Sequence, residues 1–381
     1  MIYLHMYIQI YIHVYNKYKI HEIYMTMHVL TKAKQPLNFF TDSVLDLDAV
    51  NFWLQKINPL WSSNKALGKI VQKDLAAEDM VSLTIQVNRN FKFGLAGQHH
   101  PVFAVVKGIR YERTYSLTRL DAQHVLLTVK KVNGGLVSSW FAEEATVGSL
   151  VEFGLPYGEM TVPKESTGIV LLAAGSGITP MLSLLKEMSK TQQLKQQPVQ
   201  LMYWVKHSSD AAFLERLEKL ATNNQNFSYQ VFYTQALPAD ERINATHAAM
   251  VSDLENSIVY ACGPSGFTVA AEQYFATAKS IQTEAFSMSV KANDDIGFVN
   301  ITLLQSNKIV SIPKGVSILA ALEQQNIKPK HGCRMGICNK CACNKSEGST
   351  KNLVNGAQNT EPGNLLKLCV NSAQTDLVID L

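Results

Sequence analysis

Apolar and polar residues alternate in short segments through the part of the chain that follows residue 63. Three such segments read MVSLTIQV (80–87), HVLLTVKKV (124–132) and SLVEFGLP (149–156), with turn residues between them. A period of two places one side of a segment in a core and the other in solvent, which is typical of antiparallel strands. The pattern predicts an antiparallel β-barrel domain over residues 63–164.

Longer apolar runs follow. Residues 167–188, TGIVLLAAGSGITPMLSLLKEM, read as a buried strand, a Gly-rich turn and a helix, with Thr179 and Pro180 expected at the N-cap and first helical positions. Further strand-like runs alternate with helical stretches: QLMYWV (200–205), FSYQVFY (227–233) and SIVYAC (257–262). This alternation predicts a doubly wound α/β domain over residues 165–286.

The C-terminal part has a third pattern. It follows SMSVKANDD (287–295), a polar stretch without periodicity that we interpret as a linker. Residues 298–303 and 308–312 read as a hairpin, and SILAALEQQ (317–325) as a helix capped by Ser317. With the strand-like LVIDL at the end, the pattern predicts a small α+β domain over residues 296–381.

Composition narrows the class of protein. A chain of 381 residues with 46% hydrophobic and 17% charged residues is typical of two or three globular domains. The net charge is only +4, and no block of Lys and Arg indicates nucleic-acid binding.

Residues 1–62 form an extension before the barrel. The first 30 residues are rich in Ile, Tyr, His and Met, but polar residues interrupt every apolar run before the roughly 18 residues of a membrane span. The features of a signal peptide are absent. One interpretation is an amphipathic surface helix; the other is a natural start at Met25 or Met27, so that residues 1–26 are not native. Both interpretations agree with a cytoplasmic protein. In the reducing cytoplasm, clustered cysteines bind metal rather than form disulfides.

Four of the six cysteines lie within eleven residues, CRMGICNKCAC (333–343). Three of them have the spacing Cys-x4-Cys-x2-Cys, and a distant cysteine, Cys369, follows 28 positions after the third. This is the pattern of plant-type 2Fe–2S ferredoxins, and it selects Cys333, Cys338, Cys341 and Cys369 as ligands. Gly332 and Gly336 suit a tight loop whose N–H groups point at sulfur. A structural zinc site and a reactive thiol patch are the alternatives. Zinc usually takes paired Cys-x2-4-Cys or Cys/His knuckles, and only one such pair is present.

Residues 296–381 therefore resemble a plant-type ferredoxin domain, whose fold is the β-grasp. Cys343 is surplus to a site with four thiolates.

The turn GSGITP (175–180) is a candidate nucleotide site. Glycines at 175 and 177 let a diphosphate approach backbone amides at a helix N-terminus, although the motif is not the usual GxGxxG. Cys262, at the carboxyl end of a parallel strand in ACGP, is expected to face the ligand crevice or to be a small buried side chain. A plain strand-turn-helix is the alternative for the whole motif.

A nicotinamide gives up two electrons as a hydride, whereas a 2Fe–2S cluster accepts one at a time. A carrier competent in both regimes must lie between them, and flavin is that carrier. The N-terminal barrel is the expected flavin domain.

Four motifs in series agree with this order: RTYS (113–116), GGLVSSWF (134–141), GSGITP (175–180) and ACGPSGF (261–267). Together they resemble the ferredoxin–NADP reductase superfamily over residues 63–381. The ferredoxin domain at the C-terminus is similar to that of its oxygenase- and desaturase-reductase branch.

The resemblance implies a role for each matching residue. Arg113 would pair with the FAD diphosphate, Thr114 would lie beside it in the same motif, Tyr115 would stack on the isoalloxazine and Ser116 would hydrogen-bond near its N5. The remaining flavin and nucleotide positions are Gly134, Gly135 and Ser138 for the diphosphate, Gly175, Gly177 and Thr179 for the nucleotide, and Cys262, Gly263, Pro264 and Phe286 beside the nicotinamide and flavin. Ser116 and Cys262 are the implied catalytic residues. The alternatives are ordinary strand packing for Tyr115, a solvated edge for Arg113 and a lone aromatic before the linker, without a flavin contact, for Phe286.

His99 and His100 are adjacent on an expected strand, so they point to opposite faces and do not readily chelate one ion. We interpret them as structural or near the flavin.

The residues after the expected strand 200–205 bear on the choice of nucleotide. No acidic residue stands at the strand end to bind a ribose 2′-hydroxyl, and Lys206 and Ser208 are suited to a 2′-phosphate. NADPH is therefore the expected nucleotide, with NADH as the alternative.

The sequence as a whole predicts an NAD(P)H-dependent reductase that passes electrons through FAD and a 2Fe–2S cluster to a redox protein. INPLWSSN (57–64) and CNKSEGSTKNLVNG (343–356) look like reductases that serve membrane-bound fatty-acid or acyl-CoA desaturases. That acceptor would bring the protein to a membrane surface. A reductase for a soluble oxygenase is the alternative, and an electron-storing sensor or scaffold is a third class.

Overall fold

The computed structural model describes residues 47–163, 167–235, 241–287, 297–354 and 356–381. The chain divides into two compact units, residues 1–63 and 64–381, and each is described by itself. The expectations for residues 1–30, and the linker beyond Ser287, lie outside the described residues. Within the described residues, no helix has the length and apolar content needed to cross a bilayer.

In the first unit, helix α4 (Leu47–Ile57) is followed by a short return of the chain. Asn51 on this helix is buried, and its Oδ1 accepts hydrogen bonds from the Ser62 hydroxyl at 3.1 Å and the Ser63 N–H at 2.8 Å. These bonds hold the segment after the helix against α4.

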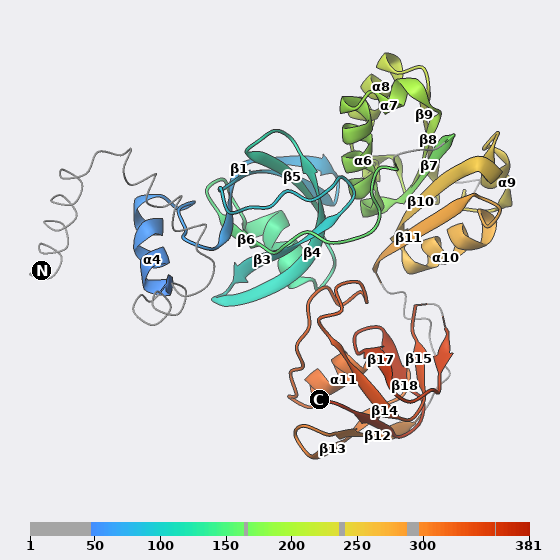
Figure 1. Ribbon diagram of the computed structural model, residues 1–381. Helices are drawn as coiled ribbons and strands as arrows, with labels where there is room; N and C mark the ends of the chain where they lie inside the picture. The colour runs from blue at the N-terminus through green and yellow to red at the C-terminus, as the bar shows by residue number, and fades with distance from the viewer. Residues whose placement is uncertain (1–46, 164–166, 236–240, 288–296, 355) are drawn as a thin grey trace, which may run out of the picture. The chain divides into compact units, whose positions relative to one another are not determined.

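The second unit begins with a closed antiparallel barrel in the order β1-β2-β5-β4-β3-β6 (Figure 1). Its strands are β1 (Ala66–Ala77), β2 (Met80–Val87), β3 (His99–Val106), β4 (Ile109–Arg119), β5 (His124–Lys130) and β6 (Leu150–Phe153). A short helix α5 (Leu136–Ser139) continues into a π-helical turn (Trp140–Glu144) between β5 and β6. Alternate residues fill the barrel with an apolar core, so the predicted architecture is confirmed.

The next part is a parallel sheet in the order β11-β10-β7-β8-β9. Its strands are β7 (Gly168–Ala174), β8 (Val199–Val205), β9 (Phe227–Tyr233), β10 (Ser257–Pro264) and β11 (Ser280–Ser287). The helices are α6 (Ile178–Lys190), α7 (Gln193–Gln196), α8 (Leu214–Asn223), α9 (Ala245–Ala249) and α10 (Ser265–Tyr274), with 3₁₀ turns at Gly175–Gly177, Ser208–Asp210 and Leu254–Asn256. The strand order reverses between β7 and β10, which is where doubly wound sheets bind ligands.

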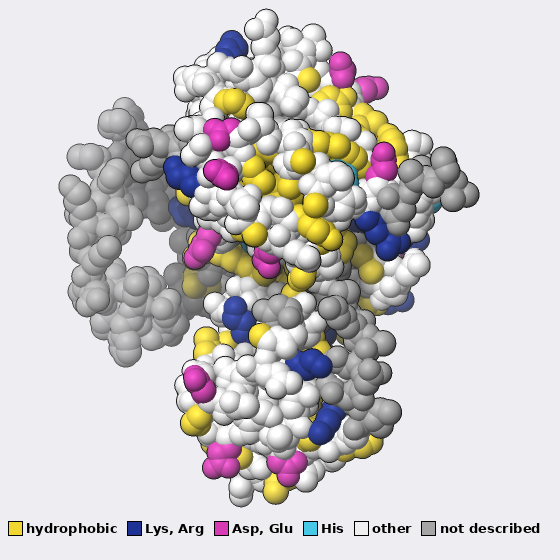
Figure 2. Space-filling view, turned by 90° about the vertical axis from the view of Figure 1, so that its right-hand side faces the viewer, with side chains coloured by type: hydrophobic (Ala, Val, Ile, Leu, Met, Phe, Trp, Pro, Cys, Tyr) yellow, Lys and Arg dark blue, Asp and Glu magenta, His cyan; other side chains and the backbone are white. Residues whose placement is uncertain are grey.

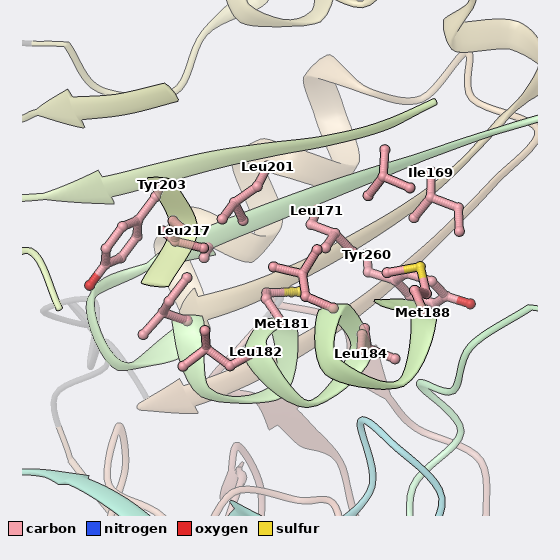
Figure 3. Close-up of a cluster of buried hydrophobic side chains, with 14 of the residues drawn as sticks. Ile169, Leu171, Met181, Leu182, Leu184, Met188, Leu201, Tyr203, Leu217 and Tyr260 are labelled. Atoms are coloured by element: carbon pink, nitrogen blue, oxygen red, sulfur yellow. The ribbon is translucent and has the colours of Figure 1, made fainter. Parts of the chain in front are cut away.

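Two apolar cores cover the two faces of this sheet. On one face, Met181 and Met188 of α6 point toward the central strands, which carry Leu171 and Leu201 (Figure 3). Leu171 is 0% exposed, so truncating it to Ala is expected to cost about 2–5 kcal/mol. This packing fixes the N-terminal end of α6 at the carboxyl end of β7.

The C-terminal part is an α+β domain with a mixed sheet in the order β13-β12-β19-β14-β17 and a small sheet in the order β16-β15-β18. Its strands are β12 (Phe298–Leu303), β13 (Lys308–Pro313), β14 (Ala342–Glu347), β15 (Thr350–Asn352), β16 (Gln358–Asn359), β17 (Asn364–Lys367), β18 (Asn371–Ala373) and β19 (Leu377–Ile379). Helix α11 (Ile318–Gln324) begins after Ser317, whose hydroxyl accepts from the Ala320 N–H at 3.3 Å. The predicted cap is confirmed.

Charges of both signs are interspersed on the face shown in Figure 2, and neither sign covers a continuous area of it. This distribution agrees with the absence of a basic block in the sequence.

Candidate functional site

The motif Arg113–Ser116 lies on β4, and its side chains line a cavity of about 260 Å³ that we call cavity A. The walls come from all three parts of the second unit. They include Arg113, Thr114, Tyr115 and Ser116 from β4, Lys130 and Ser138 from the rest of the barrel, Ser176, Thr179 and Phe286 from the parallel-sheet domain, and Cys333, Met335 and Ile337 from the C-terminal domain. Residues far apart in the sequence thus converge on one space.

A second space of about 680 Å³, cavity B, opens at the carboxyl ends of β7, β8 and β10. Its lining includes Gly175, Trp204, Lys206, Asp210, Arg242, Pro264 and Phe267. Four residues, Lys130, Val132, Ser176 and Phe286, line both cavities. Cavities A and B therefore adjoin, and Phe286 lies where they meet.

Arg113 brings a positive charge into cavity A. Its Nη1 donates to the Glu112 carbonyl at 2.7 Å, and no carboxylate in the described part of the chain forms an ion pair with it. Burial, and then the nearby Arg334, lower the pKa of Arg113, which is the direction expected of a cation that lacks a partner. An anionic group bound in the cavity would supply that partner.

The neighbouring side chains of the motif are held in place by polar and ring contacts. The Thr114 hydroxyl lies 2.8 Å from the Tyr157 hydroxyl, and Tyr115 packs edge-on against Phe141 with ring centres 5.8 Å apart. Burial raises the pKa of Tyr115, so its phenol stays neutral. The motif thus offers a fixed aromatic ring and hydroxyl groups at the cavity wall.

His99 connects the barrel to the parallel-sheet domain. It is 1% exposed, with Nδ1 3.3 Å from the Ser116 hydroxyl and Nε2 3.1 Å from Oε1 of Glu284 on β11. His100 contacts a different set of residues, stacking on Phe91 with ring centres 5.1 Å apart. The two histidines therefore face opposite sides of β3, as adjacent strand residues do.

The segment after β5 lies at the edge of cavity A. Gly135 is the N-cap of α5, and Gly134 has a φ of +73°. The Ser138 hydroxyl accepts from the Val132 N–H at 3.2 Å, so part of its hydrogen-bonding capacity already stabilises the turn. Ser138 lines the cavity, whereas the two glycines are not among the lining residues.

The structure corrects the predicted start of α6. Gly177 is the N-cap, and Thr179 and Pro180 are the second and third helical residues. A 3₁₀ turn at Gly175–Gly177 brings the chain into the helix earlier than expected, and the Thr179 hydroxyl donates to the Ser176 carbonyl at 3.1 Å instead of capping. A Cβ at Gly177 would lie 1.9 Å from the Cys262 carbonyl oxygen. Gly177 thus allows this turn to pack against β10, and Gly175 is the glycine of the pair that lines cavity B.

Cys262 is 0% exposed and packs in the apolar core, and burial raises the pKa of its thiol. Neither Cys262 nor Gly263 is among the residues that line cavities A and B, whereas Pro264 lines cavity B. Of the two interpretations given to Cys262, the structure agrees with the small buried side chain.

Cavity B contains both charge signs near the end of β8. Lys206 and Arg242 line it together with Asp210, five residues beyond the strand end at Val205. The Asp210 carboxylate accepts from the His207 N–H at 3.1 Å, which caps the short turn there. Sequence reasoning placed no acid at the strand end and missed Asp210 in this cavity.

The four predicted iron ligands lie in two pairs. Backbone N–H groups of Cys338 and Cys333 point at each other's sulfur at 3.3 and 3.2 Å, and the sulfurs of Cys341 and Cys369 are 3.2 Å apart. The N–H groups of Met335 and Gly336 approach the sulfurs of Cys333 and Cys369 at 3.4 and 3.3 Å. The loop thus surrounds the sulfurs with donors, as expected.

This donor set fits a two-iron cluster. Among the described residues, no three His, Cys, Asp or Glu side chains are placed to hold one metal ion, whereas two thiol pairs are what two irons require. The partner thiol in each pair lowers the pKa of Cys338 to about 5 and that of Cys341 to about 6. Each pair therefore contains a readily ionised thiol, which iron ligation needs.

An ion pair joins the cysteine loop to the barrel. Lys340 Nζ lies 2.6 and 2.7 Å from the two carboxylate oxygens of Glu112, the residue that precedes Arg113. A Cβ at Gly332 would lie 2.9 Å from both Cys338 Sγ and Glu112 Oε1, so any larger residue would have to displace these side chains. The close approach brings Cys333 to the wall of cavity A.

Comparisons with known proteins match this geometry part by part. Residues 68–162 match the family model of the oxidoreductase FAD-binding domain, residues 171–273 that of the oxidoreductase NAD-binding domain, and residues 301–370 that of the 2Fe-2S iron-sulfur cluster binding domain. An NADPH oxidoreductase of Mycobacterium tuberculosis is 30% identical over 340 residues, which cover 86% of this chain and 88% of that protein.

The chain belongs to the ferredoxin–NADP reductase superfamily. Within this superfamily, the reductase has the domain order of the branch that carries a 2Fe–2S domain at the C-terminus. Phthalate dioxygenase reductase of Burkholderia cepacia is 26% identical over 286 residues, covering 73% of this chain and 85% of that protein. A solved structure of a phthalate dioxygenase reductase has the same fold, with a TM-score of 0.61 at 23% identity over 83% of this chain and 98% of that one.

The reductase therefore has sites for FAD, a nicotinamide nucleotide and a 2Fe–2S cluster, and it is an oxidoreductase that transfers electrons to a partner.

Three residues at or beside cavity A were not predicted from the sequence: Lys130, Glu284 and Met335. Glu284 stands two residues before Phe286 in TEAFSM, and a charged residue so close to a predicted flavin contact was the signal available. Lys130 and Met335 carried none.

Proposed function

We propose that this reductase carries electrons from NADPH, through FAD in cavity A and a 2Fe–2S cluster on Cys333, Cys338, Cys341 and Cys369, to a separate acceptor protein. One observation supports this order above all: cavity B adjoins cavity A at Phe286, and Cys333 also lines cavity A. FAD, when bound, takes up a hydride and releases its electrons singly to an iron–sulfur cluster.

The chain's own residues would then act as follows. Arg113 would bind the FAD diphosphate, with Gly134, Gly135 and Ser138 at the adjoining turn. Tyr115 and Phe286 would bracket the flavin ring, and Ser116, oriented by His99, would donate a hydrogen bond at its edge. We assign these roles to the barrel, residues 63–164, and the cluster to residues 296–381.

The nucleotide would lie in cavity B, in the domain of residues 165–286. Gly175 would present the start of α6 to the nucleotide, with Cys262 and Gly263 in the wall behind Pro264. Thr179, which lines cavity A, would face the nicotinamide end of the nucleotide where the two cavities adjoin. Lys206 lines the cavity and Asp210 already caps a turn, so the positive charge is available to a 2′-phosphate. We therefore propose NADPH over NADH.

The variant Lys206→Ala tests this preference. It should lower kcat/KM for NADPH about tenfold, as loss of one charge-assisted bond predicts, and leave kcat/KM for NADH nearly unchanged. A wild-type preference for NADH would contradict this assignment.

For the acceptor, we propose the terminal component of a soluble oxygenase. Phthalate dioxygenase reductase, to which the chain is similar over most of its length, is named for that role. A membrane-bound fatty-acid desaturase is the second candidate, because segments 57–64 and 343–356 resemble reductases of that kind. Six free cysteines suit the reducing cytoplasm, where we place the reaction.

Anaerobic titration with NADPH tests the electron path. The flavin absorbance and the 2Fe–2S absorbance should both bleach, and a 2Fe–2S EPR signal should appear with about one spin per protein. Steady NADPH oxidation with cytochrome c as acceptor should follow, which a sensor or scaffold would not support. Bleaching of the flavin without any cluster signal would contradict the proposed path.

A further inference from the structure

One cysteine from each thiol pair lines a different opening. Cys333 lines cavity A, whereas Cys341, whose sulfur is 3.2 Å from that of Cys369, lines a groove of about 590 Å³. All residues that line this groove belong to the C-terminal domain, between Leu303 and Leu381. We call it the exit groove.

Another opening reaches Cys338, but its walls come from the barrel, the parallel-sheet domain and the C-terminal domain together. It is therefore a space between parts of this chain. The exit groove is bounded by one domain, so another protein can reach it without separating domains.

The exit groove has a basic rim. Lys328 and Lys330 line it and are exposed, and neither forms an ion pair with a carboxylate of the described residues. Lys340 also lines it, with its charge shared with Glu112. The one acidic side chain in the lining is Asp380, whose Oδ1 accepts from Gln305 Nε2 at 2.9 Å.

The charge of the whole domain has the same sign. Residues 297–381 contain nine Lys and Arg against five Asp and Glu, which amounts to the full net charge of +4 of the chain. The rest of the sequence is formally neutral. A net positive charge on the domain that holds the cluster would help to steer an oppositely charged partner to it.

The groove also has apolar contact area. Leu365 lines it and is 62% exposed, and Leu304, 50% exposed, lies between the lining residues Leu303 and Gln305. A small apolar centre with a charged rim is typical of transient redox interfaces, which must release the partner after each transfer.

We propose that the electron acceptor docks on the exit groove with an acidic surface that faces Lys328 and Lys330, and takes electrons on the Cys341 side of the cluster. This inference rests on the proposed function. One NADPH gives up a hydride and leaves as NADP⁺. Two successive one-electron transfers reduce two oxidised metal centres of the acceptor, or one centre twice, and the proton of the hydride is released to solvent. Electrons thus enter beside Cys333 and leave beside Cys341.

Charge reversal tests the surface in the full-length holoprotein. The test variant is Lys328→Glu with Lys330→Glu. The matched control is Lys195→Glu with Lys219→Glu, which reverses two exposed charges on α7 and α8 of the nucleotide domain. The probes are the soluble haem domain of cytochrome b5, an acidic one-electron acceptor, and basic cytochrome c.

At low ionic strength the test variant should lower kcat/KM for cytochrome b5 about tenfold relative to the control variant, because steering is lost. The difference should shrink to about twofold or less near 0.5 M salt, where the Debye length is only a few ångströms. Reduction of cytochrome c should be unchanged or faster. Should the reversal impair cluster content, Lys328→Gln with Lys330→Gln should show the same order with a smaller effect.

Equal slowing of cytochrome b5 reduction in the test and control variants, or no slowing in either, would overturn the docking surface. Bleaching of the flavin and cluster by NADPH is measured in each protein beforehand. A wild-type cluster that NADPH does not reduce would instead refute the proposed function, so the two failures are distinguishable.

Discussion

Nε2 of His99 lies 3.1 Å from Oε1 of Glu284, and both side chains are largely shielded from water. The contact is a close approach rather than an aligned hydrogen bond, and the other carboxylate oxygen, Oε2, is buried without a hydrogen-bond partner. Because His99 also contacts the Ser116 hydroxyl, the pair connects β11 of the parallel-sheet domain to the wall of cavity A.

The first prediction concerns this pair. His99→Leu leaves a buried carboxylate without its neighbour, so it should lower the free energy of unfolding by about 1–3 kcal/mol. Glu284→Leu should lower the free energy of unfolding by a similar amount. The double variant should lose less than the sum of the two single losses, because neither polar group then remains buried without its partner. Thermal unfolding of the four proteins gives the coupling energy, expected at about 0.5–3 kcal/mol.

Additive effects of the two substitutions would show that the pair does not interact. The rate of flavin bleaching by NADPH provides a second readout. It should fall in His99→Leu with little change in the KM for NADPH, because His99 positions Ser116 rather than the nucleotide.

The second prediction concerns retention of FAD. Arg113→Ala removes the cation that has no carboxylate partner in cavity A, so affinity for the flavin should fall by about 1.5–3 kcal/mol, roughly ten- to hundredfold. The measurement is the flavin that remains after dilution and dialysis. Arg113→Lys, the control, should retain more flavin than Arg113→Ala and less than the wild type. An alanine variant that stays fully yellow would refute the assigned role.

The third prediction distinguishes the ligand cysteines from the surplus one. Cys343 lies on β14 opposite Leu366 and packs with the domain core, and burial raises the pKa of its thiol to about 12. Cys343→Ser should therefore keep the 2Fe–2S absorbance and EPR signal, with electron transfer to cytochrome c intact. Cys369→Ser should lose or destabilise the cluster while NADPH still bleaches the flavin.

The reverse pattern, with the cluster lost in Cys343→Ser and kept in Cys369→Ser, would overturn the ligand assignment. Iron content per flavin, measured on both variants, separates loss of the cluster from loss of the protein.

The fourth prediction concerns acid stability. Burial lowers the pKa of His100 from 6.5 to about 4, and the ring is 3% exposed. Between these values the unfolded chain binds a proton that the folded chain does not, so stability falls as the pH drops from 6.5 to 4. His100 should account for up to about 3 kcal/mol of that loss.

Thermal unfolding at pH 7.5 and 4.5 tests this prediction. His100→Phe should show a smaller decrease in Tm between the two pH values than the wild type does. His124→Phe, which replaces a partly exposed histidine paired with Asp121, is the control and should behave like the wild type. An unchanged decrease in His100→Phe would contradict the prediction.

Local patterns in the sequence carried much of the architecture. The alternation in residues 80–87 matches β2 from end to end, and Ser317 caps α11 as its position predicts. These features depend on a few consecutive residues, whose side-chain period and hydrogen-bonding groups decide the backbone conformation. The spacing of Cys333 and Cys338 is also a local feature, because a tight loop of a few residues is enough to bring the two thiols together.

Prediction from the sequence failed where a distant segment decided the local structure. The N-cap of α6 is Gly177 rather than Thr179, because the turn before the helix packs against the Cys262 carbonyl of a strand more than eighty residues away. The contact between Gly177 and the Cys262 carbonyl also helps to bury Cys262. The motif alone had left two interpretations for Cys262, a place in the ligand crevice or in the core. Neither outcome can be read from the neighbouring residues.

By itself, the sequence determined which chemical groups the protein has: the RTYS strand, the Gly-rich turn and the thiols of a two-iron site. The tertiary structure alone decided that Phe286 lies between two cavities, that Cys333 lines cavity A and that Cys341 lines the exit groove. The physical reason is that these positions depend on packing between segments far apart in the sequence, both within the C-terminal domain and between domains. The ion pair of Lys340 with Glu112 is an example, because its partners are 228 residues apart. No local period or spacing records such a contact.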